Sequence, residues 1–333
     1  MHTAAISFYK SSFSNRDDYK SYLINLLKPI INQESCLVVL PGNTGLLLAL
    51  RWGDLGTPEN YREAYKSYLI LPSSWHEGLL DLHIETARQL SVYLVCGTGI
   101  FIGNHSNRTI ISYLISPHGE VLGTQKQLYL SREEKSLGIA RGEDLEVFST
   151  PMGNVGIILG SDAFYPEVGR ILSLKGADIV CHCGSLSIEE QNIDQPGENA
   201  EEIIFWRQIA GMWSQVQQNQ FFSVESQLMS TLLDRDFKGN SFILAPCEIT
   251  AEQSGFLAGI ESEKLVGLEG LLRKNILQEV PNGEYPAGVL PASEVVKAYM
   301  DFEARNKIML SYPLLKLLHP LAYGPLAFKE KEQ

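Results

Sequence analysis

Short apolar runs that stop at Pro or Gly constrain the fold of this chain more than any other feature. Residues 36–40 are all apolar and are followed by Pro41 and Gly42, and residues 178–183 form a second such run. A strand with one face in water alternates apolar and polar residues, whereas a strand covered on both faces does not. We therefore predict buried strands that lie between two covering layers.

Helices are expected between these strands. The segments with helical spacing or composition are residues 17–31, 75–90, 166–175 and 201–217. Hairpins are expected over residues 110–123 and 147–159, where Pro and Gly supply the turns. Alternation of this kind is typical of sheets with helices on their outer faces. The chain is predicted to be an α/β protein.

The region after Thr250 is less regular than the rest. No Ser-, Gly- or charge-rich linker interrupts the first 250 residues, which favours one domain over two. A helix is expected over residues 292–310, followed by a Pro-rich tail. We therefore divide the chain into a domain over 1–260 and an extension over 261–333 that packs on that domain or on a dimer partner.

Charge and hydropathy exclude two classes of partner. The formal net charge is −12, and no basic stripe offers phosphates a place to bind, so neither nucleic acid nor an anionic membrane surface is expected. Every apolar run is broken by charge, Pro or Gly before it is long enough to span a bilayer. The N-terminus has no basic segment followed by an apolar one, so a cytoplasmic protein is predicted.

The five cysteines are expected to be buried free thiols. Cys181, His182 and Cys183 are adjacent in sequence, but alternation in a strand would point the two thiols one way and the imidazole the other. No second Cys/His pair lies near them in sequence. Neither a metal site nor a cofactor is predicted.

The most specific motifs lie between Gly119 and Ser185. They are residues 119–126, 142–148, 153–170 and 176–180. Together they resemble the core of the carbon–nitrogen hydrolase (nitrilase) superfamily, in which the first block ends in a catalytic lysine and a later one reads Gly, apolar residues, Cys, an aromatic, Asp, Phe-Pro-Glu and Arg. Lys126 falls at the lysine, and Gly160 stands where the cysteine belongs.

Other blocks of the family pattern follow in order. Residues 37–42 resemble a strand that ends in Pro-Glu, with Gly42 at the place of the general base. Glu133, seven residues after Lys126, matches an auxiliary glutamate of several branches. Weaker matches occur at 218–220, 239–241 and 312–323. Their joint order makes chance similarity improbable.

The resemblance implies a fold and a chemistry. The fold is a four-layer α-β-β-α sandwich that dimerises through helices. In working members the cysteine attacks a nitrile or amide carbon, a glutamate moves protons, and the lysine stabilises the tetrahedral intermediate. The apolar segment Leu314-Leu315-Lys316-Leu317-Leu318 would be costly to leave in water and also favours a homodimer.

The two glycines argue against this chemistry here. Gly160 has no side chain to form a covalent intermediate, and Gly42 has none to carry a proton. Both are expected in strained strand-to-helix turns, which glycine tolerates best. We therefore predict a non-catalytic homologue that binds a small molecule or regulates a partner, and we do not expect an enzyme.

Two alternatives remain open. The first is an active carbon–nitrogen hydrolase with a relocated nucleophile, for which Cys183 is the first candidate; Ser161 is expected to point away from the face of position 160. The second is an oligomeric scaffold without a ligand. Asp162 and Tyr165 are further pocket candidates. Because Lys126 is expected to line the pocket, a small carboxylate or other anionic metabolite is the expected ligand.

Overall fold

Two mixed sheets form the centre of the protein. The computed structural model describes residues 1–8, 13–29, 31, 36–103, 107–187, 200–259 and 295–319, without the side chains of 200–202. The first sheet contains, in spatial order, β15 (Val295–Tyr299), β1 (His2–Ile6), β2 (Cys36–Val39), β3 (Tyr93–Val95), β5 (Arg108–Ile115) and β4 (Gly99–Ile102), with β6 (Val121–Lys126) also paired to β5. The second contains β14 (Phe256–Ala258), β13 (Phe242–Leu244), β10 (Phe222–Gln227), β9 (Ile179–Gly184), β8 (Gly153–Leu159) and β7 (Val147–Thr150).

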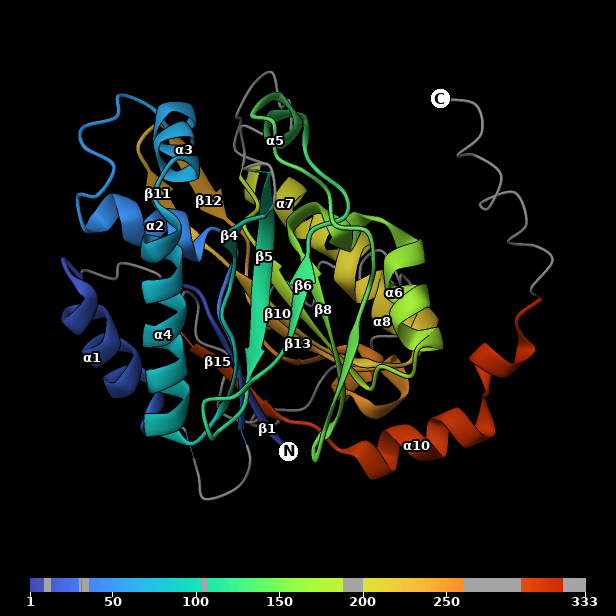
Figure 1. The fold of residues 1–333 in the computed structure, drawn as a ribbon. Helices are drawn as coiled ribbons and strands as arrows, with labels where there is room; N and C mark the ends of the chain where they lie inside the picture. Colours follow the sequence, from blue (N-terminus) through green and yellow to red (C-terminus); the bar gives the residue numbers. More distant parts are fainter. Residues whose placement is uncertain are drawn as a thin grey trace.

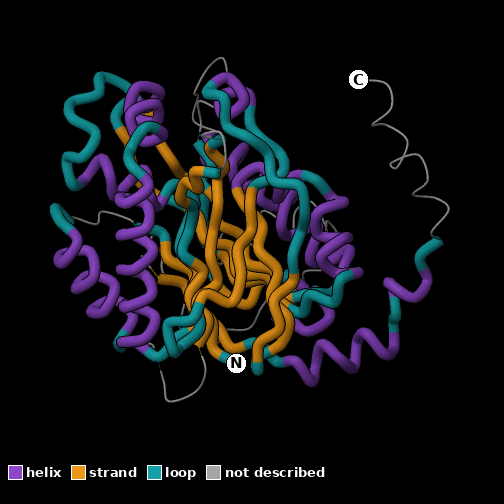
Figure 2. Tube along the Cα trace, viewed as in Figure 1, coloured by secondary structure: helices purple, strands orange, loops and turns teal. Residues whose placement is uncertain are grey.

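The sheets pack face to face between two helical layers. Figures 1 and 2 show α1 (Arg16–Leu27) and α4 (Ser73–Leu90) outside the first sheet, and α6 (Pro166–Leu174) and α8 (Ser214–Asn219) outside the second. Strands β1 and β10, and likewise β2 and β9, contact one another across the interface between the sheets. The predicted α-β-β-α sandwich is therefore confirmed.

The apolar runs form central strands, as predicted. All residues of β2 and β9 are buried, and both strands pair in parallel with a neighbour on each side. Parallel strands place their carboxyl ends at one edge of a sheet, so the chain leaves β2, β8 and β9 on the same side of the molecule. Ligand sites of open α/β sheets lie at this edge.

Short elements surround that edge. They are α2 (Thr44–Arg51), α3 (Tyr61–Leu69), α5 (Arg132–Ser136), the 3₁₀ turn η2 (Gly160–Phe164), α7 (Ala200–Gln208) and the hairpin of β11 (Met229–Leu232) and β12 (Arg235–Lys238). Figure 1 shows α3, α5 and α7 close to the same end of the sheets. Ser131 caps the N-terminus of α5. Its hydroxyl accepts from the Glu134 amide, and the Glu134 carboxylate accepts from the Ser131 amide.

The prediction of a helix over residues 292–310 is wrong for the first half of that range. Residues 295–299 form β15, which pairs antiparallel with β1, and the helix α10 covers only Phe302–Ser311. The two β-branched residues Val295 and Val296 favour a strand, and pairing to β1 satisfies their backbone. Part of the proposed C-terminal extension is thus an edge strand of the main sheet. Residues 260–294 and 320–333 of that extension lie outside the described residues.

Arg305 fixes α10 to the second sheet. It is buried, with Nη1 2.8 Å from Asp178 Oδ1, and its Nε donates to the Gln220 carbonyl. Farther along, α10 contacts the 3₁₀ turn η5 (Cys247–Ile249), and the 3₁₀ turn η7 (Leu314–Leu317) contacts α8. None of the described helices is both long enough and apolar enough to cross a bilayer.

The homodimer stays a prediction. Exposed apolar side chains in the C-terminal segment indicate which residues its interface would bury. Leu310, Tyr312 and Leu317 are 79%, 65% and 72% exposed. Burial of such side chains stabilises by roughly 1.5–3 kcal/mol each. We expect about twice the 37.1 kDa chain mass in light scattering at micromolar concentration.

The double variant Leu310→Asp/Leu317→Asp should shift this mass toward the monomer. Ile70→Asp is a matched control. Ile70 is 73% exposed, like the leucines, but it follows α3 and is not part of the C-terminal segment. A wild-type monomer, or a dimer unaffected by the double variant, would contradict this interface.

Candidate functional site

A cavity of about 300 Å³ opens where the parallel strands end. Its wall takes residues from the ends of β2 and β9, from η2, and from helices α3, α5 and α7. The lining residues include Asn43, Tyr61, Ser131, Glu133, Glu134, Gly160, Ser161, Phe164, Tyr165, His182, Ser185 and Arg207. The cavity is lined by residues from both halves of the sandwich.

Gly160 occupies a turn that favours glycine. Strand β8 ends at Leu159, and Gly160 begins η2 with a φ of +49°. This is the left-handed region that residues with a Cβ rarely adopt, so Gly160 lies in a strained turn as expected. A Cβ at this position would lie 3.1 Å from Gln127 Oε1. The Gln127 side chain therefore faces the place where a nucleophile would begin.

Gly42 is required for a different reason. Its amide donates to the Gly184 carbonyl over 2.9 Å, which joins the end of β2 in one sheet to the end of β9 in the other. A Cβ on Gly42 would lie 2.9 Å from Gly184 C and 3.0 Å from Ser185 Oγ. The positive φ, +56°, falls on Asn43 instead. Close approach of two backbones, not local strain, excludes a side chain here.

We expected Lys126 to line the cavity, but it lies outside it. Its ammonium sits 4.8 Å from the centroid of the Phe101 ring, and it is not among the lining residues. Neighbouring residues of a strand point to opposite faces, so a one-residue error in the alignment moves a side chain from one face to the other. Gln127, and not Lys126, faces position 160.

Two adjacent glutamates line the cavity in different environments. Glu134 Oε2 accepts from the Ser131 amide at 2.6 Å and from Gln127 Nε2 at 3.0 Å. Burial raises the pKa of Glu134 above its ordinary value, although these hydrogen bonds oppose the shift. Glu133 instead forms ion pairs with Arg235 Nη1 at 2.5 Å and Arg62 Nη1 at 3.8 Å.

Ser161 and Tyr165 line the cavity, whereas Asp162 does not. The Ser161 hydroxyl donates to the Tyr129 carbonyl, in the loop before α5. We expected Ser161 to point away from the face of position 160, as in a strand; β8 ends at Leu159, and Ser161 lies in η2 and lines the same cavity as Gly160. Tyr165 stacks on Tyr129 with ring centroids 3.6 Å apart. Asp162 is fully buried and accepts the amides of Leu128 and Tyr129, so it holds the loop before α5.

Cys183 is poorly suited to be a relocated nucleophile. It is fully buried, is not among the lining residues, and has Ser112 Oγ 3.9 Å from its sulfur. Burial raises the pKa of its thiol to about 12. The thiolate is the reactive form of cysteine, so this side chain is inert at neutral pH.

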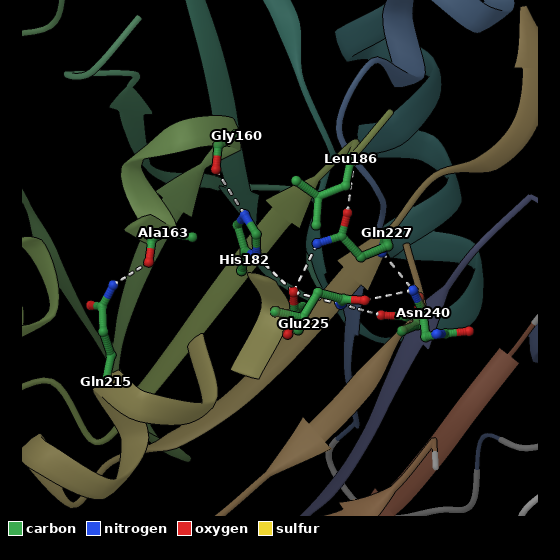
Figure 3. Close-up of polar contacts among 10 residues, drawn as sticks. Gly160, Ala163, His182, Leu186, Gln215, Glu225, Gln227 and Asn240 are labelled. Atoms are coloured by element: carbon green, nitrogen blue, oxygen red, sulfur yellow. Dashed lines mark hydrogen bonds and ion pairs between the residues drawn. The ribbon is translucent and has the colours of Figure 1, made fainter. Parts of the chain in front are cut away.

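A buried polar network lies behind Gly160 (Figure 3). His182 Nε2 is 3.1 Å from the Gly160 carbonyl, and His182 Nδ1 is 3.4 Å from Glu225 Oε1. The same Glu225 oxygen accepts from Gln208 Nε2 at 2.9 Å and Gln227 Nε2 at 2.7 Å. His182 and Glu225 are each 1% exposed.

The network indicates the protonation of His182. The Gly160 carbonyl can only accept, so Nε2 carries a hydrogen. Nδ1 faces an oxygen of Glu225 that already accepts two amide hydrogens. The Nδ1 contact has an ion-pair distance without hydrogen-bond geometry.

Several residues in the cavity wall or next to it escaped the sequence prediction. Gln127 and Glu134 each lie one position after a residue that the family pattern had selected, and they keep the same seven-residue separation. Alternation in β6 offered a signal, since Gln125 and Gln127 are both 1% exposed and share a face. Nothing in the sequence pattern indicated Arg207. Within the described parts of the chain, no group of His, Cys, Asp and Glu is arranged to hold a metal ion.

The buried carboxyl of Asp162 predicts a pH dependence of stability. Burial raises its pKa to about 7 from the ordinary 3.8, although backbone amides oppose the shift. The folded protein therefore retains a proton that the unfolded chain has released, and this contribution to stability is complete below about pH 4. It is lost as the pH rises through 7, by at most about 4 kcal/mol.

Asp162→Asn should remove this slope. The free energy of unfolding, measured in urea at several pH values, should fall between pH 4 and pH 7 by less in the variant than in the wild type. Asp17→Asn, on the exposed face of α1, should keep the wild-type slope. An unchanged slope in Asp162→Asn would contradict the assignment.

The His182–Glu225 pair predicts strong coupling. Removal of one partner leaves buried polar atoms of the network without it, so His182→Leu and Glu225→Leu should each lower the free energy of unfolding by about 1–3 kcal/mol. The double variant should lose less than the sum of the two, because the two side chains contact one another. Additive losses in this double-mutant cycle would show that the two groups do not form a pair.

Comparisons with known proteins agree with the fold. Residues 33–257 match the model of the family described as carbon-nitrogen hydrolase. A nitrilase of Pyrococcus abyssi is 30% identical over 103 residues, which are 31% of this chain and 38% of that protein. A probable hydrolase of Bacillus subtilis, YhcX, is 28% identical over 108 residues, 32% of this chain and 21% of that protein. These matches span well under two thirds of either relative.

Solved structures match over almost the whole chain. A carbon-nitrogen hydrolase from Helicobacter pylori G27 has a TM-score of 0.70 at 16% identity, covering 98% of this chain and 97% of that one. The NitN amidase from Nesterenkonia sp. AN1 has a TM-score of 0.64 at 13% identity, with coverage of 98% and 99%. Nit3 of Saccharomyces cerevisiae, a member of branch 10 of the nitrilase superfamily, scores 0.62 at 15% identity, with coverage of 94% for both. Because the family model spans most of this chain, the chain belongs to the carbon–nitrogen hydrolase family.

Proposed function

We propose that this protein is a non-catalytic member of the carbon–nitrogen hydrolase family whose cavity binds a small molecule. One observation carries the proposal. The ends of β2 and β9 are closed onto each other at Gly42 and Gly184, so the position expected for the general base has no room even for a Cβ. A glutamate cannot act from this place, and the loss extends beyond one side chain to the backbone around it.

Position 160 supports the same conclusion. In the amidase from Nesterenkonia sp. AN1, the acetamide moiety of fluoroacetamide adds covalently to the active-site cysteine. Gly160 offers no atom for such a bond. Loss of the nucleophile in a serine protease lowers turnover by about 10⁶, and the general base is lost here as well.

Gln127 supports it at a third position. Its amide faces Gly160 and bonds to Glu134, where the family pattern leads us to expect the charged lysine. A carboxamide is neutral at every accessible pH, so it cannot supply the positive charge that stabilises a tetrahedral oxyanion. Its N–H donor offers only a neutral hydrogen bond.

Substitute nucleophiles are poorly placed. Cys183 is buried and protonated, as described above. Ser161 donates its hydroxyl hydrogen to the Tyr129 carbonyl, which is not a base. Activation of a serine requires a neighbouring base within hydrogen-bond reach. The nearest imidazole described in this network, His182, directs Nε2 to the Gly160 carbonyl instead.

The open cavity favours a binding protein over a scaffold. A volume of about 300 Å³ is at the lower end of the range for small-molecule sites. A scaffold that acts only through its surface has no need of such a space, and side chains would be expected to fill it. The volume limits the ligand to a small metabolite.

The catalytic part of the proposal is tested by release of ammonia. Purified wild type should release no more ammonia than the buffer from simple nitriles, from butyramide or from N-carbamoyl amino acids. Enzyme-dependent release that disappears in Cys183→Ala or Ser161→Ala would overturn the proposal and establish a relocated nucleophile.

The closed position at Gly42 gives a separate expectation. Gly42→Glu should lower the free energy of unfolding by roughly 1–3 kcal/mol, because the new Cβ overlaps the Gly184 backbone. Gly56→Ala is a weaker control at an exposed glycine with open space around it, where only its φ of +70° opposes the change. Restoration of both residues, in Gly42→Glu/Gly160→Cys, should still give no ammonia. Recovery of activity with undiminished stability would show that the site has kept its catalytic geometry.

A further inference from the structure

We propose that the ligand of this cavity is a small anion, a carboxylate or a phosphate, whose charge is paired by Arg207. The inference rests on the proposed binding function and adds the chemical class of the ligand. The anionic ligand was first expected to pair with Lys126. The Lys126 ammonium lies over Phe101 and not in the cavity, so Arg207 takes that role in the proposal.

Among the described residues that line the cavity, one cation has no carboxylate partner. The carboxylate of Glu133 is paired with Arg235 and Arg62. Arg207 lines the cavity from α7, with its guanidinium 5.7 Å from the centroid of the Phe164 ring. Among the described residues no carboxylate lies within ion-pair distance of it. A guanidinium offers a fork of N–H donors that matches carboxylate and phosphate oxygens.

The remaining acidic group, Glu134, is engaged by the chain itself. Its Oε2 accepts hydrogen bonds from the Ser131 amide and from Gln127 Nε2. Burial raises its pKa above the ordinary value, although these hydrogen bonds oppose the shift. Arg207 is therefore the lining cation that no carboxylate of the described residues pairs.

An organic cation is the rival ligand, since the cavity has several aromatic rings. Those rings already have partners from the chain. The Arg235 guanidinium lies 4.0 Å from the Tyr61 centroid, Arg207 lies over Phe164, and Tyr129 stacks on Tyr165. A bound cation would need to displace the protein's own guanidinium groups and would meet their repulsion. The contacts therefore favour an anion.

Neutral donors and the volume restrict the anion further. The Ser131 and Ser185 side chains and Asn43 line the same cavity and can bond to the uncharged part of the ligand. Asn43 Nδ2 already donates to Tyr61 Oη at 3.1 Å, which holds its amide in place. About 300 Å³ accommodates an anion of a few carbon atoms, not a nucleotide.

The test measures binding of succinate and inorganic phosphate by calorimetry, with butyramide and butylamine as neutral and cationic probes. Succinate or phosphate should bind the wild type and raise its Tm. Arg207→Gln should weaken that binding at least about tenfold, the effect of losing one charge-assisted hydrogen bond. Arg207→Lys, which keeps the charge without the fork, should fall between the two. A preference for succinate over phosphate identifies the carboxylate class, and the reverse identifies the phosphate class.

Arg16→Gln is the matched control. The Arg16 guanidinium also lies 5.7 Å from an aromatic centroid, that of Trp52, but on α1 and outside the cavity. This variant should bind the anions as the wild type does. Equal anion affinity in the wild type and Arg207→Gln would overturn the inference, as would binding of butylamine alone.

These outcomes are separate from a failure of the proposed function. Binding of butyramide or butylamine without ammonia release would leave a non-catalytic binding protein and reject only the anionic ligand. Enzyme-dependent ammonia release would reject the non-catalytic proposal, whatever the anion measurements show. Absence of binding by every probe, with no change of Tm, would reject the anion and favour the scaffold.

Discussion

The hydrogen bond between the Gly42 amide and the Gly184 carbonyl connects the two sheets at the edge where the cavity forms. It requires two backbones to approach closely, and neither strand end tolerates a side chain. A Cβ on Gly184 would lie 2.3 Å from Gln227 Nε2, just as one on Gly42 would meet Gly184 itself. Gln227 in turn bonds to Glu225 and to the Leu186 amide. The floor of the cavity is thus built from one continuous set of contacts that begins with two glycines.

The buried polar network behind Gly160 belongs to this set. Its effect is local: His182 contacts the Gly160 carbonyl, while Glu225 accepts from the side-chain amides of Gln208 and Gln227. Glycine itself adopts positive and negative φ about equally well. We infer that the hydrogen bond from His182 to the Gly160 carbonyl favours one conformation of this turn.

The sequence allowed the layers and the strand ends to be predicted because apolar periodicity reflects burial. Residues 36–40 and 178–183 became central strands, and Gly160 lies in the turn after a strand, where it was expected. The side chains that face the cavity were harder to predict. Lys126 and Gln127 differ by one residue, and only the register of β6 decides which of them faces Gly160. β15 was misread because residues 292–310 contain both strand-forming and helix-forming positions, and pairing with β1, almost 300 residues away, decides between them.

The change at position 127 explains why the charge preference of the cavity lies at Arg207. A lysine facing Glu134 would keep that carboxylate ionised, since an opposite charge nearby favours the charged form. Gln127 gives Glu134 a hydrogen bond but no charge, and burial then raises the Glu134 pKa. With a neutral amide at position 127, the cation that lines the cavity is Arg207 on α7, which no carboxylate of the described residues approaches within ion-pair distance.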